Sequence, residues 1–332
     1  MAERIAIAGD GQMALVLAAV AVDAGHQVRL WCPLPGAAAP LAASRSSGRL
    51  PEVRLPDAVE VTQDADRALT DATMLLSAIP AQFAGPVWQR LARFAPTGAG
   101  VVTVTKGVEV GSSLRPTQVL GRALGARPLA VLSGPTIAHE LALRKPAVMV
   151  AASDDAAFAA RVQATFAQPW LRIYTGDDTV GVELAGAAKN VIALAAGMVD
   201  GLELGFNAKS ALLARGLAEI VRLGTAQGAR AETFFGVAGV GDLATTCFSP
   251  DGRNRTLGEM IGRGASLSDA LGGTQSVVEG VETARALRQV ACDCGVETPI
   301  IEAVCRVLFE GVPPRTAVRE LMARSAGAER VG

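Results

Sequence analysis

Short β-type runs alternate with helix-type segments along the first half of the chain. They cover residues 4–8, 27–31, 59–62, 72–79, 100–105, 129–132, 147–151 and 171–175. Strands separated by helices are typical of α/β folds, in which the helices return the chain so that successive strands run parallel. The pattern therefore predicts a doubly wound parallel sheet of Rossmann type.

The pattern changes near residue 178, after which helical periodicity dominates. Helices are expected over residues 181–199, 209–227, 256–263, 274–294, 299–309 and 314–323. The first of these is almost wholly apolar and contains no proline, which favours a core helix. We therefore predict an α/β domain over residues 1–180 and an all-α domain over residues 181–332.

Length and composition exclude several classes of protein. A chain of 332 residues, half of them hydrophobic, is long enough for two domains with sizeable cores. A net charge of −1 gives no general attraction to nucleic acid or to an acidic membrane. The five cysteines lack the spacing of a disulfide framework or a metal site, and no uninterrupted apolar span is long enough to cross a bilayer. We expect a cytoplasmic protein with no metal, no nucleic-acid partner and no membrane insertion.

A glycine-rich turn connects the first β-type run to the first helix. Gly9, Gly11 and Ala14 form the pattern G-x-G-x-x-A, in which Gln12 and Met13 precede the alanine. The first glycine permits a tight turn, the second lets a pyrophosphate approach the backbone, and the small third residue lets the helix pack close to the sheet. The helix N-terminus attracts the phosphates. This turn predicts a dinucleotide site.

Two strand ends bear on the same site. The second strand ends at Trp31 and continues into Pro33 without the acidic residue that commonly holds the ribose hydroxyls of NAD. No clamp for a 2′-phosphate replaces that acid, so the choice between NAD and NADP stays open. Another buried strand stops at Pro80, which suits backbone passing under a nicotinamide or ribose, although an ordinary strand end is the commoner meaning of this pattern.

Polar residues follow two of the later strands. Lys106 comes directly after a buried strand, at the edge of a parallel sheet where ligands bind in open α/β folds, although an exposed loop lysine would occupy the same position. Gly134 and Thr136 lie in a sharp turn after the next strand. The amides of this turn and the Thr136 hydroxyl are candidates to face a polar ligand.

The apolar helix that begins the second half contains one lysine near its middle. Lys189 and Asn190 are surrounded by Ala, Val and Leu. Burial disfavours an ammonium ion, so the pKa of Lys189 should fall toward the range where a lysine exchanges protons near neutral pH. The alternative is a lysine at the rim of the core that extends its ammonium to water.

A glycine- and threonine-rich segment over residues 236–255 is predicted to be a loop with a binding function. Asp242 in this segment is a candidate partner for Lys189, and Thr246 is one helical turn further on. Arg253, Asn254 and Arg255 near a helix start offer charged forks for a phosphate or carboxylate. The alternative is a solvated charged loop with a capping aspartate.

These stretches together resemble the bacterial NAD(P)-dependent glycerol-3-phosphate dehydrogenases. The matching motifs occur in the order of that family and span nearly the whole chain. They are GDGQMA at Gly9, TKGVE at Thr105, SGPTIAHE at Ser133, GVELAGAAKNVIALAAG at Gly181, GVAGVGDLATTC at Gly236, GRNRTLG at Gly252 and VVEG at Val277.

The resemblance implies a reaction and a place for it. It implies reversible reduction of dihydroxyacetone phosphate to sn-glycerol 3-phosphate for phospholipid synthesis, in a cleft between a dinucleotide domain and a helical substrate domain. Lys189 matches the catalytic lysine, which protonates the developing alkoxide and acts as base in reverse. Lys106 matches a second active-site lysine, and Asp242 matches a residue that orients the catalytic one. A homodimer is compatible with the family.

The remaining site residues are also implied by the match of motifs. The positions implied to contact substrate are Lys106, Gly134, Thr136, Lys189, Asn190, Asp242, Thr246, Gly252, Arg253 and Asn254. The positions implied to contact NAD or NADP are Gly9, Gly11, Gln12, Met13, Ala14, Trp31, Pro80, Lys106, Ala138, Arg253, Val277 and Glu279.

Departures from the family pattern affect the cofactor turn. The family usually has glycine where this chain has Ala14, other residues in place of Gln12 and Met13, and often Arg or His where this chain has Pro33. Two alternatives remain open. One is another dehydrogenase with a Rossmann domain and a helical domain, acting on β-hydroxy acids or ketopantoate. The other is a non-catalytic protein that senses NAD(P)H.

Overall fold

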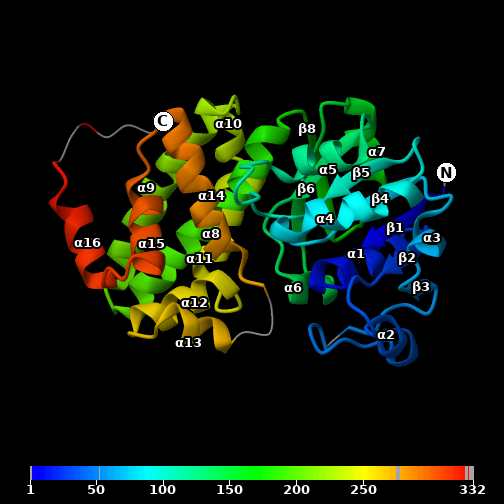
Figure 1. Ribbon diagram of the computed structural model, residues 1–332, viewed down its shortest axis with the longest axis horizontal. Helices are drawn as coiled ribbons and strands as arrows, with labels where there is room; N and C mark the ends of the chain where they lie inside the picture. Colours follow the sequence, from blue (N-terminus) through cyan, green and yellow to red (C-terminus); the bar gives the residue numbers. More distant parts are fainter. Residues whose placement is uncertain (1, 52, 274–276, 326–327, 329–332) are drawn as a thin grey trace. The chain divides into compact units, whose positions relative to one another are not determined.

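The computed structural model describes residues 2–51, 53–273, 277–325 and 328, which form two compact units (Figure 1). The first unit comprises the described residues up to Thr105 together with Pro116–Thr179. The second comprises Lys106–Arg115 and the described residues from Val180 onward. The segment 106–115 therefore folds with the helical half of the chain, although it precedes that half in the sequence.

Within the described part of the chain, the first unit contains an eight-stranded sheet in the order β3-β2-β1-β4-β5-β6-β7-β8. The strands are β1 (Arg4–Ala8), β2 (Gln27–Trp31), β3 (Val59–Thr62), β4 (Met74–Ser77), β5 (Gly100–Thr103), β6 (Leu129–Ser133), β7 (Ala147–Ala152) and β8 (Leu171–Gly176). Neighbouring strands from β3 to β6 pair in parallel. The predicted Rossmann-type α/β fold is confirmed.

One edge of the sheet departs from the predicted parallel arrangement. Strand β7 pairs antiparallel with β6 and parallel with β8. The connection from β6 to β7 contains only the five-residue helix α6 (Ala138–Ala142). Antiparallel neighbours need no crossover helix, so this short connection is sufficient. The sequence pattern of a buried strand is the same for both directions, so it could not show the reversal.

Helices cover both faces of the sheet. The helices of this unit are α1 (Gln12–Asp23), α2 (Ala38–Ser44), α3 (Ala65–Leu69), α4 (Ala81–Leu91), η1 (Ala92–Phe94), α5 (Pro116–Leu124), α6 and α7 (Ala156–Phe166). Helix α1 packs against α6 and α7, and α4 packs against α5. Right-handed crossovers that move away from β1 and β4 in opposite directions produce this arrangement. Helix α4 begins at Ala81 and contains Pro86.

The second unit is helical, as predicted. Its elements are α8 (Thr179–Gly201), α9 (Gly205–Ala226), α10 (Ala231–Phe234), the π-helical turn η2 (Val237–Gly241), α11 (Asp242–Phe248), α12 (Arg253–Gly262), α13 (Leu267–Gly272), α14 (Glu279–Cys294), α15 (Pro299–Phe309) and α16 (Pro314–Ala323). The helix predicted over residues 274–294 begins at Glu279, and residues 274–276 lie outside the described part of the chain.

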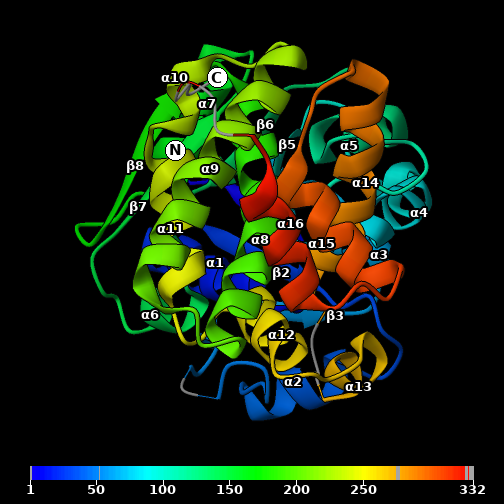
Figure 2. The same cartoon turned by 90° about the vertical axis from the view of Figure 1, so that its left-hand side faces the viewer.

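Helix α8 forms the core of this unit. Figure 2 shows it among α9, α11, α12 and α15. By length and composition α8 is the one described helix apolar enough to cross a membrane, which the sequence analysis did not anticipate. All of its most apolar stretch is buried inside the unit, however. The apolar character of α8 is therefore explained by protein packing.

Helices α8 and α12 approach each other so closely that glycine is required on both sides. A Cβ atom at Gly197 would lie 1.9 Å from the Arg255 carbonyl oxygen, and one at Gly258 would lie 2.0 Å from the Leu194 carbonyl oxygen. One turn further along, Gly201 and Gly262 face the opposite helix in the same way. We call these four residues the glycine seam. Backbone cannot move aside as a flexible side chain can, so the seam fixes the distance of α12 from α8.

Substitution of Gly258 by alanine is expected to destabilise the second unit. Overpacking a close contact typically costs about 1–3 kcal/mol. Each kcal/mol lowers the unfolding midpoint of a domain of this size by roughly 2–4 °C. Gly272→Ala is the matched control, because a Cβ at Gly272 would meet no atom within 4 Å. Differential scanning fluorimetry should show a lower midpoint for Gly258→Ala only. Equal midpoints for the two variants would contradict the role of the seam.

Candidate active site

Two lysines share one buried carboxylate in the second unit. The Lys189 ammonium donates to Asp242 Oδ1 at 2.5 Å, and the Lys106 ammonium donates to Asp242 Oδ2 at 2.8 Å. Lys189 also donates to Thr246 Oγ1 at 2.8 Å. Asp242 is 1% exposed and Lys189 is 6% exposed. These four residues form what we call the two-lysine cluster, and the predicted pairing of Lys189 with Asp242 is present in it.

The segment predicted to be a loop over residues 236–255 is largely helical. It contains η2, then α11, and then the start of α12. A Cβ at Gly239 would lie 2.1 Å from the Phe234 carbonyl oxygen, so this π-helical turn requires glycine. The turn places Asp242 at the first residue of α11 and Thr246 one turn later on the same face. The Thr246 hydroxyl donates to the Asp242 carbonyl oxygen at 2.7 Å, which fixes its position beside Lys189.

The environment of Lys189 lowers its pKa from 10.5 to about 8. Burial is the largest cause, because it disfavours the charged form of an amine. The Asp242 carboxylate acts in the opposite direction, and the Lys106 ammonium lowers the pKa further. Lys189 is therefore protonated in a large fraction of molecules at neutral pH and can still release its proton. This combination suits a residue that exchanges a proton during a reaction.

Two asparagines from α8 and α12 connect to the backbone of Lys106, and the other predicted residues of the second unit lie at the starts of α12 and α14. Asn190, next to Lys189 on α8, donates from Nδ2 to the Lys106 carbonyl oxygen at 2.9 Å. Asn254 on α12 donates to Asn190 Oδ1 at 2.9 Å. Arg253 is exposed at the first residue of α12, where it donates to the Val277 carbonyl oxygen at 3.2 Å. Gly252 is the N-cap residue of α12, and Glu279 is the first residue of α14.

In the first unit, the predicted cofactor residues lie at the switch point of the sheet. Strand β1 pairs with β2 on one side and with β4 on the other, and Gly9 and Pro80 follow β1 and β4. Gly9 has φ +122°, and a Cβ there would lie 2.8 Å from the Ala78 carbonyl oxygen. This residue must therefore be glycine. Ligands bind in open α/β sheets outside the carboxyl ends of the strands at such a point.

The start of α1 is open at Gly11. Gly11 is the N-cap of α1, and a Cβ at this position would meet no atom within 4 Å. Gln12 and Met13 form the first turn, and Ala14 is fully buried against the sheet. The absent side chain at Gly11 leaves free backbone amides open to an anion. The residues present at this turn fit a dinucleotide phosphate.

The other residues predicted in the first unit lie at the ends of strands or at the start of a helix. Trp31 ends β2, is 3% exposed and donates from Nε1 to the Gln63 carbonyl oxygen at 2.9 Å. Gly134 follows β6 with φ +151°, and Thr136 Oγ1 donates to its carbonyl oxygen at 3.1 Å. Ala138 begins α6. The contacts predicted for these four residues with substrate or cofactor stay predictions.

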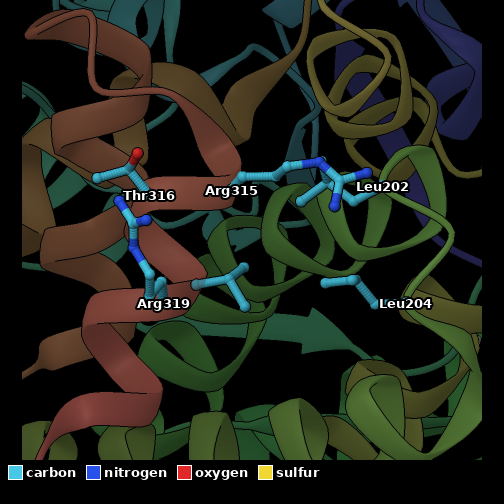
Figure 3. Close-up of a pocket in the computed structure, with 6 residues that line it drawn as sticks. Leu202, Leu204, Arg315, Thr316 and Arg319 are labelled. Carbon is cyan, nitrogen blue, oxygen red and sulfur yellow. The ribbon is translucent and has the colours of Figure 1, made fainter.

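A pocket elsewhere in the second unit contains none of the predicted site residues. It has a volume of about 280 Å³ and lies against α16 (Figure 3). Its lining residues are Leu202, Leu204, Arg315, Thr316, Val318 and Arg319. The pocket is therefore separate from the two-lysine cluster.

The fold and these residues define a class of protein. A glycine turn at the switch point of a doubly wound sheet binds dinucleotides, and a buried lysine with a lowered pKa provides acid–base chemistry. The class is that of the dinucleotide-dependent oxidoreductases.

Comparison with known proteins identifies the family within this class. Residues 4–159 match the N-terminal model, and residues 178–319 the C-terminal model, of NAD-dependent glycerol-3-phosphate dehydrogenase. A glycerol-3-phosphate dehydrogenase [NAD(P)+] of Parafrankia sp. is 45% identical over 98% of each chain. That of Geobacter sulfurreducens is 43% identical over 99% of this chain and 100% of the relative.

A solved structure agrees with these matches. The crystal structure of glycerol-3-phosphate dehydrogenase from Coxiella burnetii has a TM-score of 0.94 and 33% identity, covering 97% of this chain and 99% of that chain. The chain belongs to the NAD-dependent glycerol-3-phosphate dehydrogenase family. It is an NAD(P)-dependent oxidoreductase, which excludes a non-catalytic sensor and assigns it to this family among the Rossmann-plus-helical dehydrogenases.

Gly280 was not predicted from the sequence as a site residue. It contacts Asn254, the hydrogen-bond partner of Asn190. Its N–H donates to Asn254 Oδ1 at 3.0 Å. The sequence signal was the glycine in VVEG, where only Val277 and Glu279 were given a role. A glycine directly after a candidate contact residue, at the start of a helix, is a hint that backbone approaches another group closely there.

Replacement of Asp242 by asparagine is expected to lower the pKa of Lys189 below about 8, because the carboxylate is the group that favours its charged form. The fraction of protonated Lys189 near neutral pH then falls. We expect the reduction rate to drop at least roughly tenfold, with its decline at alkaline pH shifted to lower pH. Initial rates of NAD(P)H oxidation as a function of pH test this. Asp293→Asn, at an exposed position, is the control. We call the decline of the rate at alkaline pH the alkaline limb. An alkaline limb that moves to higher pH, or that stays at the wild-type pH, would contradict this prediction.

Proposed function

We propose that Lys189 is the general acid when this enzyme reduces dihydroxyacetone phosphate to sn-glycerol 3-phosphate with NAD(P)H. The observation that carries the proposal is the two-lysine cluster, in which a buried amine of lowered pKa is held by a carboxylate and a hydroxyl. Lys189 is one of only two buried lysines among the four that the chain contains. The other is Lys209, which donates to both oxygens of Asp200 at 3.0 and 2.7 Å.

When bound, NAD(P)H would supply the hydride for the carbonyl carbon. The Lys189 ammonium gives a proton to the carbonyl oxygen as negative charge develops on it, so that the C=O group becomes CH–OH. The neutral amine then regains a proton from solvent. In the oxidation direction the neutral amine removes the hydroxyl proton. A pKa of about 8 allows both directions near neutral pH.

The neighbours of Lys189 have distinct roles in this proposal. Asp242 and Thr246 accept hydrogen bonds from the ammonium and thereby hold it in one direction. Lys106 shares Asp242 and places a second positive charge in the cluster. That charge stabilises a developing alkoxide and also keeps the pKa of Lys189 low.

The start of α12 is the proposed phosphate site. Gly252 leaves the first backbone N–H groups of the helix uncovered by a side-chain cap, and the N-terminus of a helix favours an anion. Arg253 and Asn254 are the first two residues of α12, and the exposed guanidinium of Arg253 is suited to bidentate phosphate binding. Gly134 and Thr136 remain substrate contacts proposed from the family resemblance.

The cofactor site is proposed from the glycine turn, and the cellular role is proposed from the chemistry of the product. The turn over residues 9–14 is the proposed pyrophosphate site, and the preference between NAD and NADP is left to measurement because the end of β2 carries no acid. Glycerol 3-phosphate is the backbone of glycerophospholipids, so we propose that the enzyme supplies their synthesis from the cytoplasm. A homodimer, expected from the family, stays a prediction.

Removal of the Lys189 amine is expected to lower the rate of dihydroxyacetone phosphate reduction by roughly a hundredfold or more, as befits the loss of a general acid. Lys189→Met keeps most of the volume of the side chain. Lys145→Met is the matched control, because Lys145 is half-exposed and pairs with Glu140 in the first unit. Rates with NADH and with NADPH, measured in parallel, also settle the cofactor preference. A folded Lys189→Met variant that keeps wild-type kcat would overturn the proposal.

The pH dependence of the rate should respond to Lys106. Reduction needs protonated Lys189, so kcat is expected to be level at lower pH and to fall as pH rises through about 8. Lys106→Gln removes a neighbouring charge that lowers the pKa of Lys189. The Asp242 carboxylate then pairs with the Lys189 ammonium only. Both effects raise that pKa, so the alkaline limb of kcat should move to higher pH. A limb that stays at the wild-type position would contradict the proposed coupling of the two lysines.

A further inference from the structure

A continuous line of hydrogen bonds connects the start of α14 with the backbone of Lys106. The Gly280 N–H donates to Asn254 Oδ1 at 3.0 Å, and Asn254 Nδ2 donates to Asn190 Oδ1 at 2.9 Å. Asn190 Nδ2 then donates to the Lys106 carbonyl oxygen at 2.9 Å. Asn190 is 6% exposed and Asn254 is 8% exposed, and Gly280 is buried. We call this series the amide line.

The direction of the amide line is fixed at both ends. The Gly280 N–H can only donate, so Asn254 must turn its oxygen toward it. Asn254 then donates from its side-chain nitrogen to Asn190, whose side-chain oxygen must accept this bond. This leaves the Asn190 nitrogen facing the Lys106 carbonyl oxygen, which can only accept. All three bonds are satisfied in one orientation alone, so the line is an ordered structure and not a set of interchangeable contacts.

Space, and not backbone conformation, requires glycine at position 280. A Cβ there would lie 2.4 Å from Asn254 Oδ1 and 2.8 Å from the Asn190 carbonyl oxygen. Both atoms belong to residues of the amide line: one to the side chain of Asn254, the other to the backbone of Asn190. Any side chain at this position therefore has to push Asn254 away from its place.

Lys106 is held at two separate points by the helices of the second unit. Its ammonium is held by Asp242, and its carbonyl oxygen is held by Asn190. The segment 106–115 has a further anchor at its other end, where the partly exposed Arg115 forms an ion pair with the buried Glu183 of α8. If the Asn190 bond is lost, the backbone of Lys106 can shift while Asp242 still attracts its side chain. The ammonium then no longer has one fixed distance from Lys189.

We propose that Gly280 is a positioning residue for the reaction, because the close approach of its backbone orders Asn254 and Asn190 and thereby fixes Lys106 beside Asp242 and Lys189. This inference rests on the proposed function of Lys189 and Lys106. It gives Asn254 a role in addition to phosphate binding, since a carboxamide nitrogen carries two hydrogens and only one is used toward Asn190.

Gly280→Ala tests the proposal directly. We expect kcat for dihydroxyacetone phosphate reduction to fall at least roughly tenfold, a modest part of what a misplaced catalytic group costs. The alkaline limb of kcat should move to higher pH, in the direction expected for Lys106→Gln. Gly272→Ala, which adds a methyl group in open space, should leave both the rate and the limb unchanged.

A second variant keeps the test informative if Gly280→Ala does not fold. Asn254→Asp has nearly the same shape and still accepts from Gly280, but it has no hydrogen to give to Asn190. The line then contains two facing acceptors, whichever way Asn190 turns. Its alkaline limb should also move to higher pH. The added carboxylate by itself also raises the pKa of Lys189, so only the part of this upward shift in the pH profile that disappears when Lys106→Gln is added reports displacement of Lys106.

The double variant Gly280→Ala with Lys106→Gln separates positioning from general damage. If Gly280 acts through Lys106, the double variant should show the same alkaline limb as Lys106→Gln alone.

The proposal would be overturned if Gly280→Ala had lower thermal stability but kept its alkaline limb at the wild-type pH. It would also be overturned if the alkaline limb of the double variant lay at a different pH from that of Lys106→Gln alone. Wild-type kcat in Lys189→Met would instead overturn the proposed function. Strong effects of Lys189→Met and Lys106→Gln without a limb shift in Gly280→Ala or Asn254→Asp would overturn the amide line alone.

Discussion

The arrangement of the helical unit depends on one buried carboxylate, Asp242, which binds two ammonium groups. Removing charges from water is costly, and attraction between them offsets that cost only when the groups are well paired and hydrogen-bonded. Asp242 is 1% exposed and each of its oxygens accepts from a different lysine. Two protonated lysines and one carboxylate leave an excess positive charge. The lowered pKa of Lys189 follows from burial first and then from this excess, and it is the property that the proposed catalysis needs.

The scaffold around Asp242 is built from close backbone contacts. The glycine seam sets α12 against α8, and the π-helical turn before α11 brings Asp242 and Thr246 to one face. The choice of lysine is equally specific. The chain has 31 Lys and Arg residues, of which only Lys106, Lys145, Lys189 and Lys209 are lysines. Arginine does not lose its proton in proteins, so among the Lys and Arg side chains only these four can exchange a proton.

Much of this could be predicted from the sequence, because it is expressed in local patterns. Alternating strands and helices gave the Rossmann-type sheet, and a lysine within an apolar helix indicated a buried amine with a candidate partner in Asp242. The reversal of β7, the helical nature of residues 242–248 and the attachment of Lys106 to the helical unit were not predictable. Each depends on contacts between distant segments, and glycine-rich sequence is as compatible with a loop as with a tight π-helical turn. The pairing of Asn190 with Asn254 has no local signal at all.

The central claim is that the protein itself, before any substrate binds, sets the acidity of Lys189. A protein with only four lysines allows this to be measured directly, by labelling the lysine ε-carbons with ¹³C and following their NMR shifts from neutral to alkaline pH. The resonance that disappears in Lys189→Met identifies the residue. The account predicts that this resonance titrates with an apparent pKa of about 8. Titration at the ordinary lysine value of 10.5 would contradict it.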